Sequence, residues 1–161
     1  MTVAFLTRKR RRAAVALGAV SAGLLVLSAC DKPTPVATVT VGSKSVNSEA
    51  ACYSDDKEGL PPKQIATCLN EKADHSISVD PSDKIRFGVD PEIADNGWTI
   101  FLGGQAAEPE PFKKTYRTIP ASAFFSTQTG ETTDNTQVTI VENSGKTVKG
   151  IWHFELKKKD S

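Results

Sequence analysis

Hydrophobic and polar residues alternate along several short segments of the chain. A period of two is typical of a strand that buries one face and exposes the other. In residues 84–89, for example, Ile85, Phe87 and Val89 fall on one face. The same pattern predicts strands over residues 38–41, 76–79, 84–89, 98–102, 136–141 and 152–157.

Turn-forming residues lie between these predicted strands. Asp80-Pro81-Ser82-Asp83 fits a tight turn, because proline at the second position presets φ. Asn143-Ser144-Gly145-Lys146 predicts a hairpin loop between the last two strands. Many short strands with frequent turns favour a β-sandwich. The order of elements resembles an immunoglobulin-like antiparallel β-sandwich, which implies a mainly β fold.

One segment of the body has helical rather than strand periodicity. Residues 61–69 open with two prolines, which suit a helix start, and Ile65, Cys68 and Leu69 recur at helical spacing. We therefore expect one short helix in the sandwich. The large aromatic residues are expected to form the core, since a sandwich of this size needs such anchors; they are Phe87, Trp98, Phe124, Phe125, Trp152 and Phe154.

The first 29 residues are predicted to be a signal-peptide helix. Five basic residues lie within residues 8–12, and an apolar stretch follows over residues 13–27. A basic region before an apolar core of this length is typical of a secretory signal. An uncleaved transmembrane anchor is the alternative, although about 20 apolar residues are usual for a span. Arg11-Arg12 leaves open whether export is general secretory or twin-arginine.

The end of this stretch, Leu27-Ser28-Ala29-Cys30, resembles the lipobox of bacterial lipoproteins. The resemblance implies that Cys30 receives a diacylglyceryl group and becomes the first residue of the processed chain. Two acyl chains give stable membrane attachment, whereas one gives only reversible attachment. Residues 30–37, which contain two prolines, are then a lipidated tether, and residues 38–161 form the sandwich domain.

The other two cysteines, Cys52 and Cys68, are expected to form a structural disulfide. A disulfide is the default for an even number of cysteines outside the cytoplasm. A redox-active pair and a pair of metal ligands are the alternatives. A redox pair normally has Cys-x-x-Cys spacing, which these residues lack.

Charge argues against nucleic acid as a partner. The chain of 161 residues has a formal charge of +1, with 20 basic and 19 acidic residues. All the acidic residues follow position 30, so the part after the leader has 15 basic side chains and a net charge of −4. An acidic body lacks the basic patch that nucleic acid binding needs.

Candidate chemistry in the body is sparse, and we expect neither an enzyme nor a metal or cofactor. A blue-copper site needs two histidines, a thiolate and usually a methionine. His75 and His153 are available, but the only methionine is the initiator, and strand alternation predicts His153 to be solvent-exposed. Paired carboxylates could serve glycoside chemistry, at Asp90 and Glu92 or at Glu108 and Glu110, but in such runs we expect solvated loops.

The body as a whole resembles small actinobacterial lipoproteins that carry a domain of unknown function. The similarity rests on the lipobox, on residues 81–87, on Asn96-Gly97-Trp98 and on residues 150–154. We expect a monomer anchored by lipid on the extracytoplasmic face of the cell membrane of a Gram-positive-type bacterium.

The expected role is a non-catalytic module that binds a ligand or assists envelope assembly, with an envelope protein as its partner. The alternative is a substrate-capturing lipoprotein that serves a transporter or an envelope enzyme. The long polar connections 103–115 and 126–135 are the candidate binding surfaces, because long loops on a rigid scaffold often carry binding.

Overall fold

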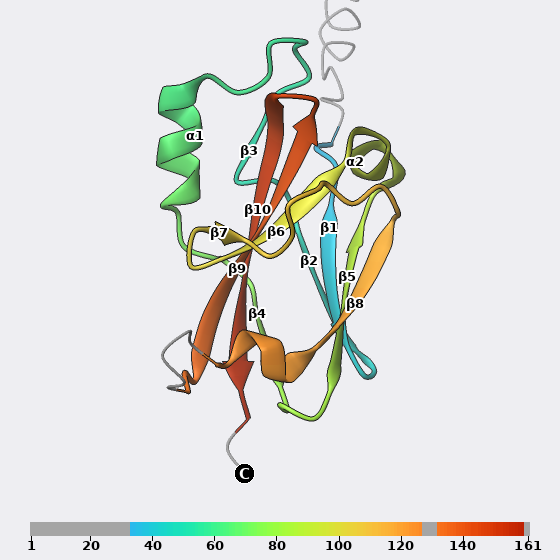
Figure 1. Cartoon of the computed structure of the whole chain (residues 1–161), viewed down its shortest axis with the longest axis vertical. Helices are drawn as coiled ribbons and strands as arrows, with labels where there is room; N and C mark the ends of the chain where they lie inside the picture. Colours follow the sequence, from blue (N-terminus) through green and yellow to red (C-terminus); the bar gives the residue numbers. More distant parts are fainter. Residues whose placement is uncertain (1–32, 127–131, 160–161) are drawn as a thin grey trace, which may run out of the picture. The chain divides into compact units, whose positions relative to one another are not determined.

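The computed structural model describes residues 33–126 and 132–159, which form two packed β-sheets (Figure 1). The first sheet is four-stranded and antiparallel, with strand order β2-β1-β5-β8. Its strands are β1 (Ala37–Val41), β2 (Lys44–Ser48), β5 (Lys84–Val89) and β8 (Tyr116–Pro120).

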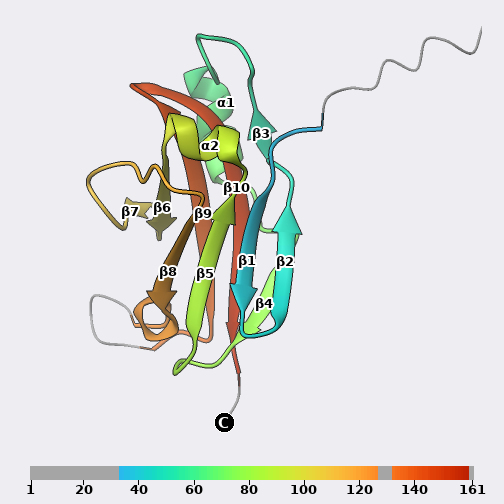
Figure 2. The ribbon, with the colours of Figure 1, turned by 90° about the vertical axis from the view of Figure 1, so that its right-hand side faces the viewer.

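The second sheet is six-stranded, with order β3-β10-β9-β6-β7 and with β4 on the same edge of β10 as β3 (Figure 2). Its strands are β3 (Cys52–Tyr53), β4 (Ser76–Val79), β6 (Trp98–Leu102), β7 (Gln105–Ala106), β9 (Asn135–Ser144) and β10 (Thr147–Lys158). The pairing of β4 with β10 is parallel and the other pairings are antiparallel. The expected mainly β sandwich is confirmed.

The connection between β4 and β5 passes from one sheet to the other. Asp83 donates its N–H to the Asp80 carbonyl at 2.9 Å, so the predicted turn forms. This turn joins strands of different sheets, so β4 and β5 do not form a hairpin. The predicted hairpin at residues 143–146 does form, between β9 and β10, and Gly145 takes the positive φ of 64° that the turn requires. At the other end, β1 begins at Ala37, a residue expected in the tether.

The predicted short helix is α1 (Pro62–Leu69). Two further short helices were not expected, α2 (Pro91–Asn96) and the 3-10 helix η1 (Ala121–Phe124). Helix α2 has proline at its first turn, and Gly97 ends it with φ 107°. The Asp90-Pro91 pair and Gly97 were the available signals. Among the described residues, no helix has the length and apolar character needed to cross a membrane.

The six aromatic residues predicted for the core are all buried. Phe87, Trp98, Trp152 and Phe154 are completely inaccessible, and Phe124 and Phe125 are each 3% exposed. The Phe87 and Phe124 rings lie 5.4 Å apart and tilted at 45°. Each indole N–H finds a carbonyl, Trp98 at Lys114 (2.8 Å) and Trp152 at Pro35 (3.0 Å). Burial of these rings therefore leaves no indole N–H without a partner.

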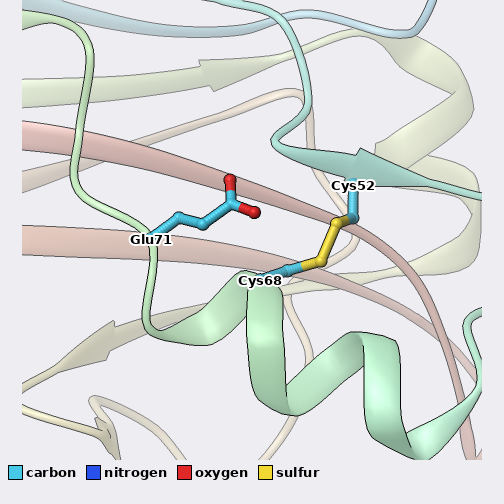
Figure 3. A group of neighbouring side chains, drawn as sticks. All are labelled: Cys52, Cys68 and Glu71. Carbon is cyan, nitrogen blue, oxygen red and sulfur yellow. A yellow bond between two sulfur atoms is a disulfide. The ribbon is translucent and has the colours of Figure 1, made fainter.

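A second, smaller cluster lies on the outer face of the six-stranded sheet. Helix α1 contributes Cys68 and Ile65, and Leu60 lies two residues before the helix. These residues pack against Val141 of β9 and Ile151 of β10. Sheet residues under α1 are consequently buried although they point away from the sandwich core. The disulfide between Cys52 and Cys68 joins β3 to α1, with a Cα–Cα distance of 6.2 Å (Figure 3).

We expect this disulfide to stabilise the fold by roughly 3 kcal/mol, the chain-entropy value for a closed loop of this length. The variant with both Cys52→Ala and Cys68→Ala should lose about that free energy of unfolding in urea titrations. Cys30→Ala is the control, since it leaves the disulfide intact. A double variant as stable as the control would show that α1 is held over the sheet by packing alone.

Candidate functional site

Described residues of the two loops selected from the sequence lie together and line a groove of about 710 Å³, here called the distal groove. Its walls come from the β6–β7 hairpin, from the segment around η1 and from the start of β9. The lining residues are Leu102, Gly103, Gln105, Ala106, Ala107, Ala123, Phe124, Ser126, Thr133, Asn135, Thr136 and Gln137. None of these side chains is charged, so the groove offers amides, hydroxyls and small apolar groups.

Unequal strand lengths create the distal groove. Strand β6 ends at Leu102, which pairs with Val138, whereas β9 begins three residues earlier at Asn135. Gly103 and Gly104 have φ of 55° and 80°, and they turn the chain back into the short strand β7. The Thr136 hydroxyl donates to the Phe124 carbonyl at 2.6 Å and holds the other wall in place.

The distal groove lies in the half of the sandwich remote from the start of β1. Ala37 pairs with Val89, and the Asp90 N–H donates to the Val36 carbonyl, so α2 follows directly at the β1 start. Strand β6 begins after α2 and runs away from that end, which places Leu102 in the opposite half. Figure 2 shows α2 at one end and η1 at the other.

The rest of the 103–115 loop is tied down and does not line the distal groove. Phe112 exchanges two backbone hydrogen bonds with Trp98, at 2.7 and 3.0 Å, and its ring meets the indole edge-on at 5.5 Å. Arg117 lies over the Phe112 ring and pairs with Glu108. The loop is thus folded against β6 and β8, and its binding surface is limited to residues 103–107.

Three of the four candidate catalytic carboxylates, Asp90, Glu92 and Glu108, have structural contacts. Asp90 accepts the Val36 N–H at 2.8 Å, which fixes the start of β1. Glu92 accepts the Tyr53 hydroxyl at 3.4 Å, and Glu108 pairs with Arg117. These contacts position chain segments and do not direct two carboxylates toward a common substrate.

The expectation that His153 is solvent-exposed is wrong, because its side chain is 3% exposed. The sheet face that it shares with Ile151 is covered by α1 and by the segment after it. His153 Nε2 lies 2.8 Å from the Cys68 carbonyl oxygen, which can only accept, so Nε2 carries the hydrogen. Nδ1 then accepts from the Thr139 hydroxyl at 2.9 Å.

His75 and His153 line a common groove. Both ring nitrogens of His153, however, are hydrogen-bonded, one to the Thr139 hydroxyl and the other to the Cys68 carbonyl. Over the described ranges, one group of possible metal-binding atoms lies within 4.8 Å of one another, from Cys52, Cys68 and Glu71. Figure 3 shows the Glu71 carboxylate extending toward the disulfide. Cysteine ligates a metal ion as a thiolate, and these two sulfur atoms are bonded to each other.

Glu142 is a buried carboxyl that sequence analysis missed. It follows Val138 and Ile140 on the core-facing side of β9 and is completely inaccessible. Asn96 donates its amide to Oε1 at 2.6 Å, while Oε2 has no hydrogen-bond partner among the described residues. Burial raises the pKa of Glu142, although the Asn96 hydrogen bond opposes the shift. Period-two alternation from Val138 was the signal that could have identified it.

Tyr53 lies close to this carboxyl. Burial raises the pKa of the Tyr53 hydroxyl, and the negative charges of Glu142 and Glu92 raise it further. The hydroxyl is therefore a neutral donor to Glu92 throughout the physiological pH range. It adds no titratable group to the site.

Comparison of the chain with models of protein families, with curated proteins and with solved structures finds no match. Cys30, the predicted lipidation site, lies outside the described residues.

Glu142→Gln should stabilise the protein at neutral pH. Because the folded-state pKa of Glu142 is raised, its contribution to stability is fully present below its unfolded pKa of about 4.3 and is lost as the pH rises through the folded pKa. Glutamine keeps an acceptor for Asn96 without the buried charge. The glutamine NH2 group takes the place of Oε2 and also lacks a partner, so the gain comes from removal of the charge alone. We expect it to be about 1 kcal/mol at pH 7 and to shrink toward pH 4.

Urea titrations between pH 4 and pH 8 measure this difference. Glu58→Gln, at an exposed position, is the matched control and should change little. A Glu142→Gln variant that is less stable than the native chain at every pH would show that the carboxylate has a favourable partner.

Proposed function

We propose that the protein is a lipid-anchored, extracytoplasmic module that binds an envelope protein through the distal groove and carries out no catalysis. Cys30 would carry the diacylglyceryl anchor on the outer face of the cytoplasmic membrane. The observation that carries the proposal is the placement of the distal groove in the half of the sandwich opposite the start of β1. With an anchor at one end and the distal groove at the other, the groove would face away from the membrane and be accessible to other envelope proteins.

The short connection between Cys30 and the folded body supports this arrangement. The Trp152 indole binds the Pro35 carbonyl, and Asp90 binds the Val36 N–H, so the body begins five residues after Cys30. Five residues span at most about 17 Å. A lipid on Cys30 would therefore hold this end of the sandwich at the bilayer surface.

The chemistry of the distal groove supports binding over catalysis. Among the described residues, its lining contains no carboxyl, imidazole, ammonium or thiol group that could act as an acid, a base or a nucleophile. Amides, hydroxyls and small apolar groups are suited to hydrogen bonding and shape recognition. They are the kind of groups that contact a peptide or another neutral polar surface.

Solute capture for a transporter or an envelope enzyme is the second candidate function. It is favoured by the volume of the distal groove, about 710 Å³, which lies within the range of small-molecule sites, ~300–1,000 Å³.

Cys30→Ala should abolish the acyl modification and release the protein from membranes. Intact-mass measurement and membrane fractionation of bacteria expressing each variant test this. The variant with Cys52→Ala and Cys68→Ala is the control and should remain acylated. If Cys30→Ala stayed membrane-bound, the apolar segment 13–27 would be the anchor instead.

A photo-crosslinking amino acid at Ala107 should capture an envelope protein in living cells, because Ala107 is an exposed residue of the distal groove. Ala123→Trp, also at an exposed lining position, fills the groove and should reduce this crosslink at least several-fold. A crosslinker at Lys44, an exposed residue of β2, is the control position. A protein captured equally from Lys44, or equally with Ala123→Trp, would contradict binding in the distal groove. A crosslink lost on addition of a small solute would favour the capture function.

A further inference from the structure

The outer edge of β10 has a gap between its two neighbouring strands. Strand β3 pairs with Gly150 and Ile151, and β4 pairs with β10 from Glu155 onward. Figures 1 and 2 show β3 and β4 beside opposite halves of β10. Two backbone hydrogen bonds mark the limits of the gap: Ala51 N–H to the Ile151 carbonyl at 2.8 Å, and Glu155 N–H to the His75 carbonyl at 2.9 Å.

Strand geometry directs the peptide groups of His153 into this gap. Along a strand, every second residue presents its N–H and C=O to the same edge. Ile151 and Glu155 bond toward the β3 and β4 edge, so the N–H and C=O of His153 face it too. Neither β3 nor β4 has a residue paired with His153, and the turn and loop hydrogen bonds of residues 33–126 and 132–159 include none to its N–H or C=O. The direct contact of the His153 and Thr139 side chains agrees with this assignment, because side chains approach most closely at non-hydrogen-bonded pairs.

A groove of about 550 Å³, here called the edge groove, opens onto the gap. One wall comes from residues 47–51 and the other from residues 71–75, with Val36 and His153 completing the lining. Ala50 and Ala51 are small and leave room beside the strand. The gap between Ile151 and Glu155 spans about 13 Å, the length of a short extended segment.

The rim of the edge groove carries excess negative charge. Glu49, Glu71 and Asp74 contribute carboxylates, and Lys72 contributes the one ammonium group among the lining residues. All four are exposed. A ligand that reaches the gap past this rim is favoured if it carries positive charge.

We propose that the edge groove binds an extended, basic peptide segment of a partner protein, which adds a short strand to β10 between β3 and β4. A peptide carbonyl accepts the His153 N–H, and a peptide N–H donates to the His153 carbonyl. A lysine or arginine of the segment pairs with the carboxylates at the rim. Main-chain bonds of this kind provide affinity in strand addition, and side-chain contacts provide specificity. The edge groove is separate from the distal groove, and the proposal does not depend on lipidation of Cys30.

Amide NMR of the isotope-labelled protein tests this with capped tetrapeptides, because peptide variants leave the protein's folding unchanged. The probe is acetyl-Thr-Lys-Thr-Val-amide. It should shift the His153 amide resonance and slow its hydrogen exchange. The same peptide N-methylated in the middle, which loses a donor, should bind about tenfold more weakly. Glutamate in place of lysine should abolish binding at the concentrations used.

Protein variants then separate the two parts of the proposed contact. Ala50→Trp should fill the edge groove and remove the peptide-induced shift, while the spectrum confirms that the variant is folded. Glu71→Gln with Asp74→Asn should weaken binding several-fold and reduce its salt dependence, since exposed ion pairs are individually weak. An unshifted His153 amide, equal binding of the N-methylated peptide, or equal shifts with free lysine amide would overturn the proposal.

Discussion

The hydrogen bond between His153 and the Cys68 carbonyl fixes the layer that covers the six-stranded sheet. The last carbonyls of a helix have no donor within the helix, so each needs one from elsewhere. At the end of α1 the Cys68 carbonyl accepts the Glu71 N–H at 3.1 Å and, in addition, the His153 imidazole N–H at 2.8 Å. The Thr139 hydroxyl supports the ring from the other side. Gln137 adds a bond from its amide to the Glu71 carbonyl, just after the helix. With the disulfide, these contacts hold α1 on the sheet at both β3 and β10.

Because α1 is held there, β10 is buried on both faces along its middle. Trp152 and Phe154 point into the sandwich, while Ile151 and His153 lie beneath α1 and the segment after it. A strand whose side chains are buried on both faces of the sheet can still have backbone groups without a neighbouring strand along one edge. This is the situation at His153, whose side chain is enclosed although its peptide groups face the edge groove. Burial of the side chain and availability of the backbone are thus separate properties of one residue.

Sequence periodicity identifies which side chains share a face of a strand or helix. The predictions of burial were accurate wherever only one face of the element is covered. Six aromatic residues were assigned to the core correctly, as were the helix at α1 and the β9–β10 hairpin. Exposure of His153 was predicted wrongly because alternation cannot report a helix that returns to cover the outer face. Ile151 and Val141 were the available signals, since both are apolar on the face that alternation leaves to solvent. The buried carboxyl of Glu142 was missed because alternation places this residue on the core-facing side of β9, where a charged side chain is not expected.

Both grooves arise where one strand extends past the end of its neighbour. Sequence analysis therefore selected the loops of the distal groove without its shape, and it did not select the segments that line the edge groove. The distal groove depends on β9 extending past the end of β6, and the edge groove on β3 and β4 covering different halves of β10. Strand ends of this kind follow from tertiary packing and not from local propensity.

A body held by a connection of at most about 17 Å would have little freedom to reorient at a membrane. In that case the two grooves would meet different partners: the edge groove, lined in part by Val36, would face segments close to the bilayer, and the distal groove would face molecules farther out.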